Sequence, residues 1–421
     1  MSKTIIIIGA GLAGLSAALQ AAENGCNVKL VSSLPSERAQ SVMAEGGINA
    51  ALNTKDENDS PEEHFTDTIK AACGLADPNA VWGMTQAAPE LVHWLLKLGV
   101  KFNMSGYDDV DLRNFGGQKK KRTAFAQSDT GKQIMTAMID AVRRKEASGM
   151  VERFSHHSFL TLRLCGNICC GCVIRDEYSQ ETVELPGDAV IVATGGMHGL
   201  FGNTTGSLSN TGEVTAELFR LGVPLANGEM IQYHPTTVKC GGKRMLISEA
   251  ARGEGGRLFA MKDGKQWYFM EEKYPELGNL MPRDITAREI WKVSHESEVF
   301  LDMTEISEEI ISNKLSGLAD DCMTYLHKDI RKEPVSVLPG IHYFMGGILV
   351  DEQHRTPIQN LYAAGECCAQ YHGANRLGGN SLLGALYGGR VAAKSACEQA
   401  DVVDLSLSLI HISEPTRPRL I

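Results

Sequence analysis

Several side chains in this 421-residue sequence are of a type and setting that could bind a small anion. His234 precedes a proline, His342 precedes Tyr-Phe-Met-Gly-Gly, and Arg376 precedes a Leu-Gly-Gly turn. Arg283 follows a proline, and the hydroxyl of Ser248 could join this set. A guanidinium binds a carboxylate through two parallel hydrogen bonds, so two such clusters could hold both carboxylates of a small dianion. Taken singly, the histidines could instead be structural, and Arg376 could form a surface salt bridge.

A glycine-rich turn near the start of the chain has the order expected of a dinucleotide site. The β-branched run Thr4–Ile8 predicts a buried parallel strand, and GAGLAG at residues 9–14 leads directly into a helical pattern at 15–24. Gly9 allows the tight turn, Gly11 lets the backbone approach a pyrophosphate, and Gly14 lets helix pack on strand. A second predicted strand, 27–31, ends at Ser32, where an NAD site would have an acidic ribose ligand.

Two more predicted strands run into glycine turns. Residues 188–192 lead into Ala193, Thr194 and Gly195, and residues 360–362 lead into a turn that ends at Glu366. The carboxyl ends of parallel strands meet at one edge of a sheet, so all three turns can approach one cofactor. Three such turns fit FAD better than NAD.

Composition excludes some classes of function. The chain has 41 Lys and Arg against 51 Asp and Glu, a net charge of −10, which argues against broad nucleic-acid binding. The basic run at 119–122 is either a solvated face or an attractor for an anion. With neither a long apolar run nor a signal peptide, we expect a cytoplasmic protein without a membrane span. Of the 11 cysteines, Cys165, Cys169 and Cys172 fall in two short predicted strands, where a buried structural role is favoured over redox or metal chemistry. No metal site is expected.

Together these segments resemble the flavoprotein subunits of succinate dehydrogenase and fumarate reductase, a family that includes L-aspartate oxidase. The matching segments, in family order, are AEGGINA at 44–50, NFGGQ at 114–118, SDTG at 128–131, QYHPT at 232–236, EAARGEGG at 249–256, PRD at 282–284, HYFMGG at 342–347 and ANRLGGNSL at 374–382.

The resemblance implies a mechanism. Arg283 matches the acid that protonates one alkene carbon of fumarate while hydride reaches the other. Glu249 and Arg252 match a relay that restores the proton, and their spacing of three places them on one helical face, where they could also form a simple salt bridge. The implied catalytic residues are Arg283, Glu249, Arg252, His234, His342 and Arg376. The implied substrate-binding residues are Phe115, His234, Ser248, Arg283, His342, Arg376 and Gly379.

The resemblance also implies the residues that bind FAD. They are Gly9, Ala10, Gly11, Gly14, Ser32, Ser41, Gly46, Gly47, Asp129, Ala193, Thr194, Gly195, Glu366, Arg376, Ser381 and Leu382. Serine at position 32 is common in these relatives. Many relatives attach FAD through a histidine where this chain has Gln40, so we expect noncovalent FAD. Because covalent attachment raises the flavin potential in the family, its absence favours fumarate reduction.

The family fold implies an α/β protein in two domains. A Rossmann-like FAD-binding domain is expected at 1–225 and 346–404, interrupted by a mobile α+β capping domain at 226–345. Residues 407–417 (LSLIHISEPTR) resemble the translation of a sequencing-library adapter, the alternative being an amphipathic tail. We therefore expect 405–421 to be a non-native tail and the family's C-terminal helical domain to be missing.

Three functions remain open from the sequence. The first is the flavoprotein subunit of a fumarate reductase or succinate dehydrogenase, acting on a small dicarboxylate. It would exchange electrons with an iron–sulfur subunit or other electron-transfer protein, and its place would be the cytoplasm or, through partner subunits, the inner membrane face. The second is L-aspartate oxidase, which the segment at 115–118 disfavours. The third is a flavin-binding fragment without turnover.

Overall fold

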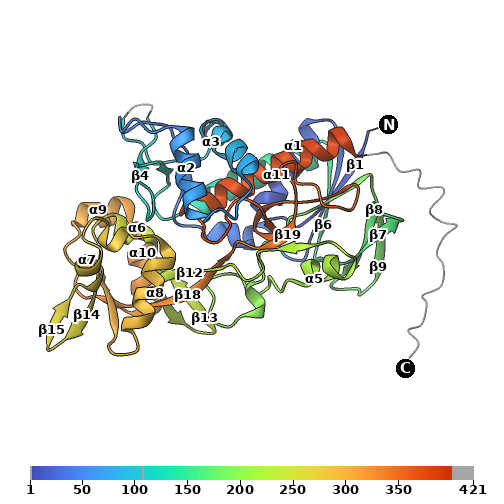
Figure 1. The fold of residues 1–421 in the computed structure, drawn as a ribbon. Coiled ribbons are helices and arrows are strands. Elements are labelled where there is room, and N and C mark those ends of the chain that lie inside the picture. Colours follow the sequence, from blue (N-terminus) through green and yellow to red (C-terminus); the bar gives the residue numbers. More distant parts are fainter. Residues whose placement is uncertain (1, 107–108, 401–421) are drawn as a thin grey trace, which may run out of the picture.

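A computed structural model describes residues 2–106 and 109–400, and the predicted tail at 405–421 lies outside them. Figure 1 shows two bodies, a larger one built around a parallel sheet and a smaller one formed by the yellow and orange elements.

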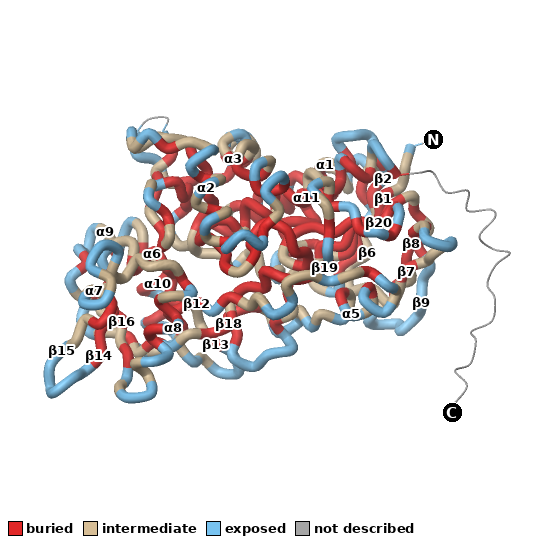
Figure 2. The backbone as a smooth tube through the Cα atoms, viewed as in Figure 1, coloured by how far each residue is buried: buried red, intermediate tan, exposed pale blue. Residues whose placement is uncertain are grey.

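The larger body is organised by a five-stranded parallel sheet in the order β20-β10-β1-β2-β6. Its strands are β1 (Thr4–Ile8), β2 (Asn27–Ser32), β6 (Val151–Ser155), β10 (Ala189–Val192) and β20 (Leu361–Ala363). Alternate residues of a strand point to opposite faces. Accordingly Ile5 and Ile7 join one core cluster, while Ile6 and Ile8 join another. Both faces are buried, which explains the continuous apolar run at β1 (Figure 2).

Helices cover one face of this sheet. The core there draws on α1 (Leu12–Glu23), α3 (Pro78–Leu98), α4 (Thr130–Ala147) and α11 (Asn380–Gln399), and α2 (Pro61–Ala71) packs on α3. Helix α1 begins at Leu12, three residues before the predicted start at residue 15, because Gly11 already serves as its N-cap. Asp77 caps α3, Pro78 occupies its first turn, and Gly99 ends it at φ 100°.

An antiparallel sheet of β7 (His157–Cys165), β8 (Ile168–Asp176) and β9 (Thr182–Pro186) covers the other face. Cys169 and Cys172 lie buried in β8, and burial raises the pKa of each thiol to about 12. Such thiols stay protonated and make poor nucleophiles, which supports the structural role expected for them.

The smaller body has its own core, drawn from residues 247–337 and Phe115. Its sheet pairs β14 (Arg257–Lys262) with β15 (Lys265–Trp267) and β16 (Val299–Asp302), which pairs with β17 (Val335–Ser336). Its helices are α6 (Glu249–Gly253), α7 (Phe269–Lys273), α8 (Arg283–Val293), α9 (Glu308–Lys314) and α10 (Ser316–Asp321). Apart from Phe115, this core lies inside the predicted insertion at 226–345, although the boundaries themselves stay a prediction.

Strands β12 (Ile231–Cys240) and β18 (Leu338–Phe344) run between the two bodies, with β13 (Lys243–Leu246) at the edge (Figure 1). The remaining short elements are β3 (Ile48–Asn49), β4 (Leu112–Arg113), β5 (Thr123–Ala124), α5 (Glu213–Arg220), β11 (Leu225–Ala226), β19 (Gly347–Leu349), β21 (Cys368–Ala369), the 3₁₀ turns Ser36–Arg38, Gln40–Met43, His198–Leu200, Gly278–Leu280 and Gly365–Cys367, and the π turn Cys322–Leu326.

Three residues of the basic run at 119–122 pair with carboxylates, and Lys120 lies 3.8 Å from Glu63. Arg122 is fully buried and pairs with Asp59 at 2.8 Å and Asp67 at 3.0 Å. The neighbouring Lys121 lies 3.8 Å from Glu57. The run is therefore not a purely solvated face, because Arg122 is a buried structural residue. Across residues 2–106 and 109–400, the structure contains no helix long and apolar enough to cross a membrane.

Candidate active site

A cavity of about 310 Å³ lies where the two bodies meet. One side is lined by the turns that follow β1, β2, β10 and β20, together with residues 38–41 and 43–47 and the start of α11. The other side is lined by His234, Leu246, Ser248, Glu249 and Arg283. Segments far apart in the sequence thus meet at the carboxyl edge of the parallel sheet, where ligands of such folds bind.

The glycines after β1 form a cradle into which a cofactor backbone fits. Gly9 has φ +111°, a conformation rare for other residues, and its N–H donates to Val31 O at 2.8 Å. A Cβ on Gly14 would collide with the carbonyl of Gly9, so α1 crosses β1 at close range. The first turn of α1 can therefore present its free N–H groups to a pyrophosphate, which is the arrangement that FAD requires.

Most of the residues predicted to bind FAD line this cavity. They are Gly9, Ala10, Gly11, Ser32, Ser41, Gly46, Gly47, Ala193, Thr194, Gly195, Glu366, Arg376, Ser381 and Leu382. Gly14 lies behind the lining, where its missing side chain permits the close packing described above. Asp129 also lies off the cavity, at the N-cap of α4.

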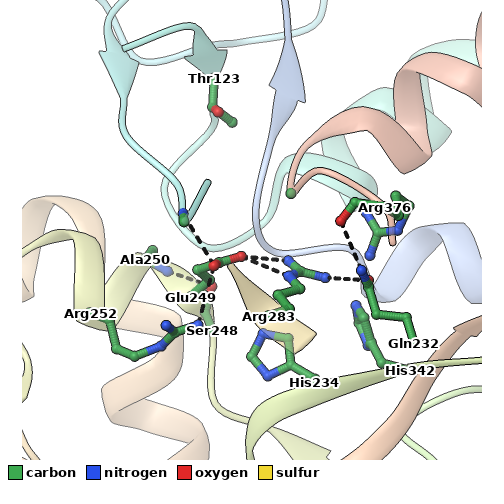
Figure 3. A network of polar contacts seen from close by, with 12 residues as sticks. Thr123, Gln232, His234, Ser248, Glu249, Ala250, Arg252, Arg283, His342 and Arg376 are labelled. Carbon is green, nitrogen blue, oxygen red and sulfur yellow. Dashed lines mark hydrogen bonds and ion pairs between the residues drawn. The ribbon is translucent and has the colours of Figure 1, made fainter. Parts of the chain in front are cut away.

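Arg283 and Glu249 form the centre of the opposite side (Figure 3). Arg283 donates from Nε and Nη2 to Glu249 Oε2, at 2.9 and 2.7 Å, and from Nη1 to Gln232 Oε1 at 3.1 Å. Arg283 begins α8 and Glu249 begins α6, and both side chains are almost fully buried. The first turns of α6 and α8 therefore hold this ion pair against the cavity.

Glu249 also receives hydrogen bonds on its second oxygen. Gly116 N–H and Arg252 Nη2 each donate to Oε1 at 3.2 Å. Burial opposes ionisation of Glu249, but Arg283 and Arg252 outweigh it and hold the pKa of this carboxyl below its usual value. Arg252 does not line the cavity and is reached through Glu249, so the three side chains form a row from the cavity inward.

The two predicted histidines lie together, with ring centroids 5.1 Å apart. His342 Nδ1 lies 2.8 Å from the hydroxyl of Thr205, and His234 Nδ1 contacts the backbone of Thr236. Burial, reinforced by nearby charges that include Arg283, lowers the pKa of both rings well below the usual value. Both histidines are therefore neutral hydrogen-bonding groups at pH 7.

Arg376 presents an unpaired guanidinium. It lies over the ring of Tyr343 at 4.4 Å, and among the described residues no hydrogen bond or ion pair engages its side chain, whose Nε is buried. Burial and then Arg283 lower the pKa of Arg376 to about 9, so it stays protonated at pH 7. Burying a cation without a partner costs folding free energy. The unpaired Arg376 therefore indicates that an anionic ligand binds here.

The charges of this side suit a dianion. With Glu249 ionised and three guanidinium groups protonated, the site carries two positive charges in excess. Phe115 and Leu246 contribute apolar surface, and Ser248 and Gly379 also line the cavity. All the residues predicted to bind substrate are thus brought together, although their roles stay predictions.

Among the residues at the site that were not predicted individually, two have a clear structural role or a perturbed pKa. Gln232 bridges the two halves, because its Nε2 donates to Asn375 Oδ1 and to Arg376 O, each at 2.8 Å. Glu45 lines the cavity, and burial, aided by Asp321, raises its pKa to about 8. Both fall inside the segments that carry the resemblance, and their position next to predicted site residues was the only available signal.

The FAD binding domain family matches residues 4–382. The succinate dehydrogenase flavoprotein subunit of Bacillus subtilis is 44% identical, and the match covers 97% of this chain and 72% of that protein. The L-aspartate oxidase of Streptomyces coelicolor is 34% identical over 94% of this chain and 69% of its own length.

Among solved structures, the fold matches E. coli quinol fumarate reductase with a TM-score of 0.89 and 30% identity. That match covers 97% of this chain and 73% of the other. The predicted α/β fold with an FAD-binding domain and an inserted capping domain is confirmed. FAD as the cofactor is likewise confirmed.

Proposed function

Because the chain belongs to the FAD-dependent oxidoreductase family of the succinate dehydrogenase and fumarate reductase flavoprotein subunits, we propose that it interconverts fumarate and succinate. One observation carries the proposal. A site with two excess positive charges, centred on the Arg283–Glu249 pair and the unpaired Arg376, faces the glycine cradle across one cavity.

The basic groups bind the substrate. Arg376 would hold one carboxylate, and the neutral His234 and His342, together with the Ser248 hydroxyl, supply hydrogen bonds for the pair of carboxylates. The apolar ring of Phe115 excludes water from the carbons between them. Bound FAD supplies or accepts the hydride that these carbons exchange.

Arg283 supplies the proton in the reduction of fumarate. Its guanidinium is held at one end of the cavity by Glu249 and Gln232, so an N–H can be aimed at the second alkene carbon. A hydride to one carbon and this proton to the other convert fumarate into succinate. The deprotonated guanidine, unstable in itself, regains a proton through Glu249 from Arg252, and Arg252 in turn takes up a proton from solvent. Succinate oxidation uses the same groups in reverse.

Two observations bear on the direction. Gln40 lines the cavity and cannot form a histidyl bond to FAD, which favours fumarate reduction as the sequence predicts. The Bacillus subtilis relative is named a succinate dehydrogenase, which favours succinate oxidation as the second candidate. We expect an iron–sulfur subunit or another electron-transfer protein as the electron partner, since several relatives are named flavoprotein subunits.

The proposal is tested with the purified holoprotein. Reduced viologen should be oxidised in the presence of fumarate, and succinate should reduce an artificial electron acceptor more slowly. Absence of turnover with both substrates contradicts the proposal. Flavin reduction by L-aspartate, with no response to succinate, would replace it with the activity of the Streptomyces coelicolor relative.

A further inference from the structure

A buried histidine outside the substrate site contacts a carboxylate of the cofactor side. His198 is 1% exposed and stands at the start of the 3₁₀ turn His198–Leu200. Its Nε2 lies 3.2 Å from Oε1 of Glu366, which lines the cavity, and its Nδ1 lies 2.8 Å from Oγ1 of Thr204. The mechanism above makes no use of His198.

The hydrogen bonds around Thr204 accommodate both protonation states of His198. The Thr204 hydroxyl accepts from Gly206 N–H at 3.0 Å and has the carbonyl of Ile341 at 3.2 Å. If the hydroxyl donates to Ile341 O, Nδ1 of His198 must donate to Thr204, and the ring is an imidazolium. If the hydroxyl donates to Nδ1, the ring is neutral. Because Glu366 Oε1 is an acceptor, Nε2 carries a proton in either state.

Packing fixes this ring in place. His198 meets the ring of Phe344 edge-on, with centroids 5.0 Å apart. A Cβ on Gly206 would collide with the imidazole, so only glycine fits against it. The backbone N–H of Phe344 also donates to Glu366 Oε1, at 3.0 Å. Oε1 of Glu366 is thus held by two donors, while no hydrogen bond from the described residues reaches Oε2.

The titratable groups near His198 are few. Glu366 faces it from the turn Gly365–Cys367, and His342 lies on β18 close enough to be affected by its charge. Among the described residues, the ring also contacts Thr204, Gly206 and Phe344, which carry no charge. His198 is therefore the one side chain among the described residues that donates to Glu366, although the charge of Arg376 also acts on this carboxylate.

We propose that His198 is a positioning residue for the cofactor, which holds the Glu366 carboxylate in place and offsets its charge so that bound FAD is easier to reduce. A carboxylate accepts from hydroxyl donors, so the free Oε2 suits the hydroxyl-bearing part of FAD. Reduction adds negative charge to the flavin, and an uncompensated carboxylate nearby opposes it. The inference rests on the proposed placement of Glu366 against FAD and does not depend on the substrate.

The test measures the midpoint potential of bound FAD and its dissociation constant, both without substrate. His198→Phe keeps a ring against Phe344 but cannot donate, and it should favour oxidised over reduced FAD by about tenfold, about 30 mV for a two-electron couple. His198→Gln restores one neutral donor and should recover part of this shift. His295→Gln is the matched control, because the imidazole of His295 is exposed and, among the described residues, hydrogen-bonds only to Trp291 O.

A double-mutant cycle distinguishes an effect that His198 exerts through Glu366 from a general structural effect of the substitution. Glu366→Gln should raise the potential, and in that background His198→Phe should cause no further shift, because it acts through the carboxylate. The proposal is overturned if His198→Phe shifts the potential equally in both backgrounds, if it causes no shift in the parent, or if Glu366→Gln changes neither quantity. Should His198→Phe not retain FAD, the same criteria apply to His198→Gln. A protein that failed to turn over fumarate would still give this result.

Discussion

Replacing Arg283 with alanine tests the assignment of the proton donor. The guanidinium makes two bonds to Glu249 Oε2, at 2.9 and 2.7 Å, and one to Gln232. Arg283→Ala removes the acid and also lowers the excess charge of the site. General acid catalysis contributes about 10²–10⁴ in rate, equivalent to about 3–5 kcal/mol in the activation barrier. We expect kcat for fumarate to fall by at least that factor, with a higher KM.

FAD should remain bound in this variant, since the glycine cradle lies on the other side of the cavity. Glu249 keeps its bonds to Arg252 and Gly116, which limits the cost of an unpaired buried charge. Turnover with reduced viologen and the flavin absorbance per protein are the two measurements. The matched control is Arg288→Ala on the same helix. The Arg288 side chain is 60% exposed, and its ion pair with Asp284 is long, at 3.7 Å. A kcat for Arg283→Ala within threefold of the parent, with FAD bound, would refute the reasoning.

Further predictions concern pH, stability and the cofactor. The kcat/KM for fumarate should halve near pH 9, where Arg376 loses its proton, and a profile flat through pH 9 would contradict this role. The folded chain keeps the Glu45 proton up to a pKa of about 8, whereas the unfolded chain loses it near 4.5, so stability falls as pH rises between these values. Glu45→Gln should therefore raise Tm above pH 8 and change it little near pH 4.5, as thermal unfolding at the two pH values would reveal. Gly14→Ala should abolish FAD binding, measured by flavin fluorescence, while Gly202→Ala, where a Cβ meets open space, should not. Acid precipitation should leave the flavin in the supernatant, because Gln40 cannot bond to it covalently, and flavin in the pellet would count against this.

Local patterns in the sequence predict the cofactor half of the molecule well. The run Thr4–Ile8 forms β1 with the predicted bounds, because β-branched residues and the following glycines act within a few positions. The start of α1 is displaced from the prediction because Gly11 caps a helix that begins at Leu12. These features depend on neighbours in sequence and hence on information that a single chain contains.

The substrate half depends on long-range contacts. Glu249 and Arg283 are 34 positions apart and meet because α6 and α8 both begin at the cavity. The pair of Glu366 and His198 is separated by 168 positions, and no periodicity joins them. The resemblance to a family indicated which residues matter, whereas their contacts, and the bridging position of Gln232, required the structure.

A single-turnover experiment tests the central claim most directly, since it needs no electron-transfer partner. The holoprotein is reduced under anaerobic conditions and mixed with fumarate while the flavin absorbance is followed. The account predicts full reoxidation of the flavin, with one succinate formed for each FAD, and no reoxidation by a monocarboxylate such as crotonate. A flavin that stays reduced in the presence of excess fumarate would contradict it.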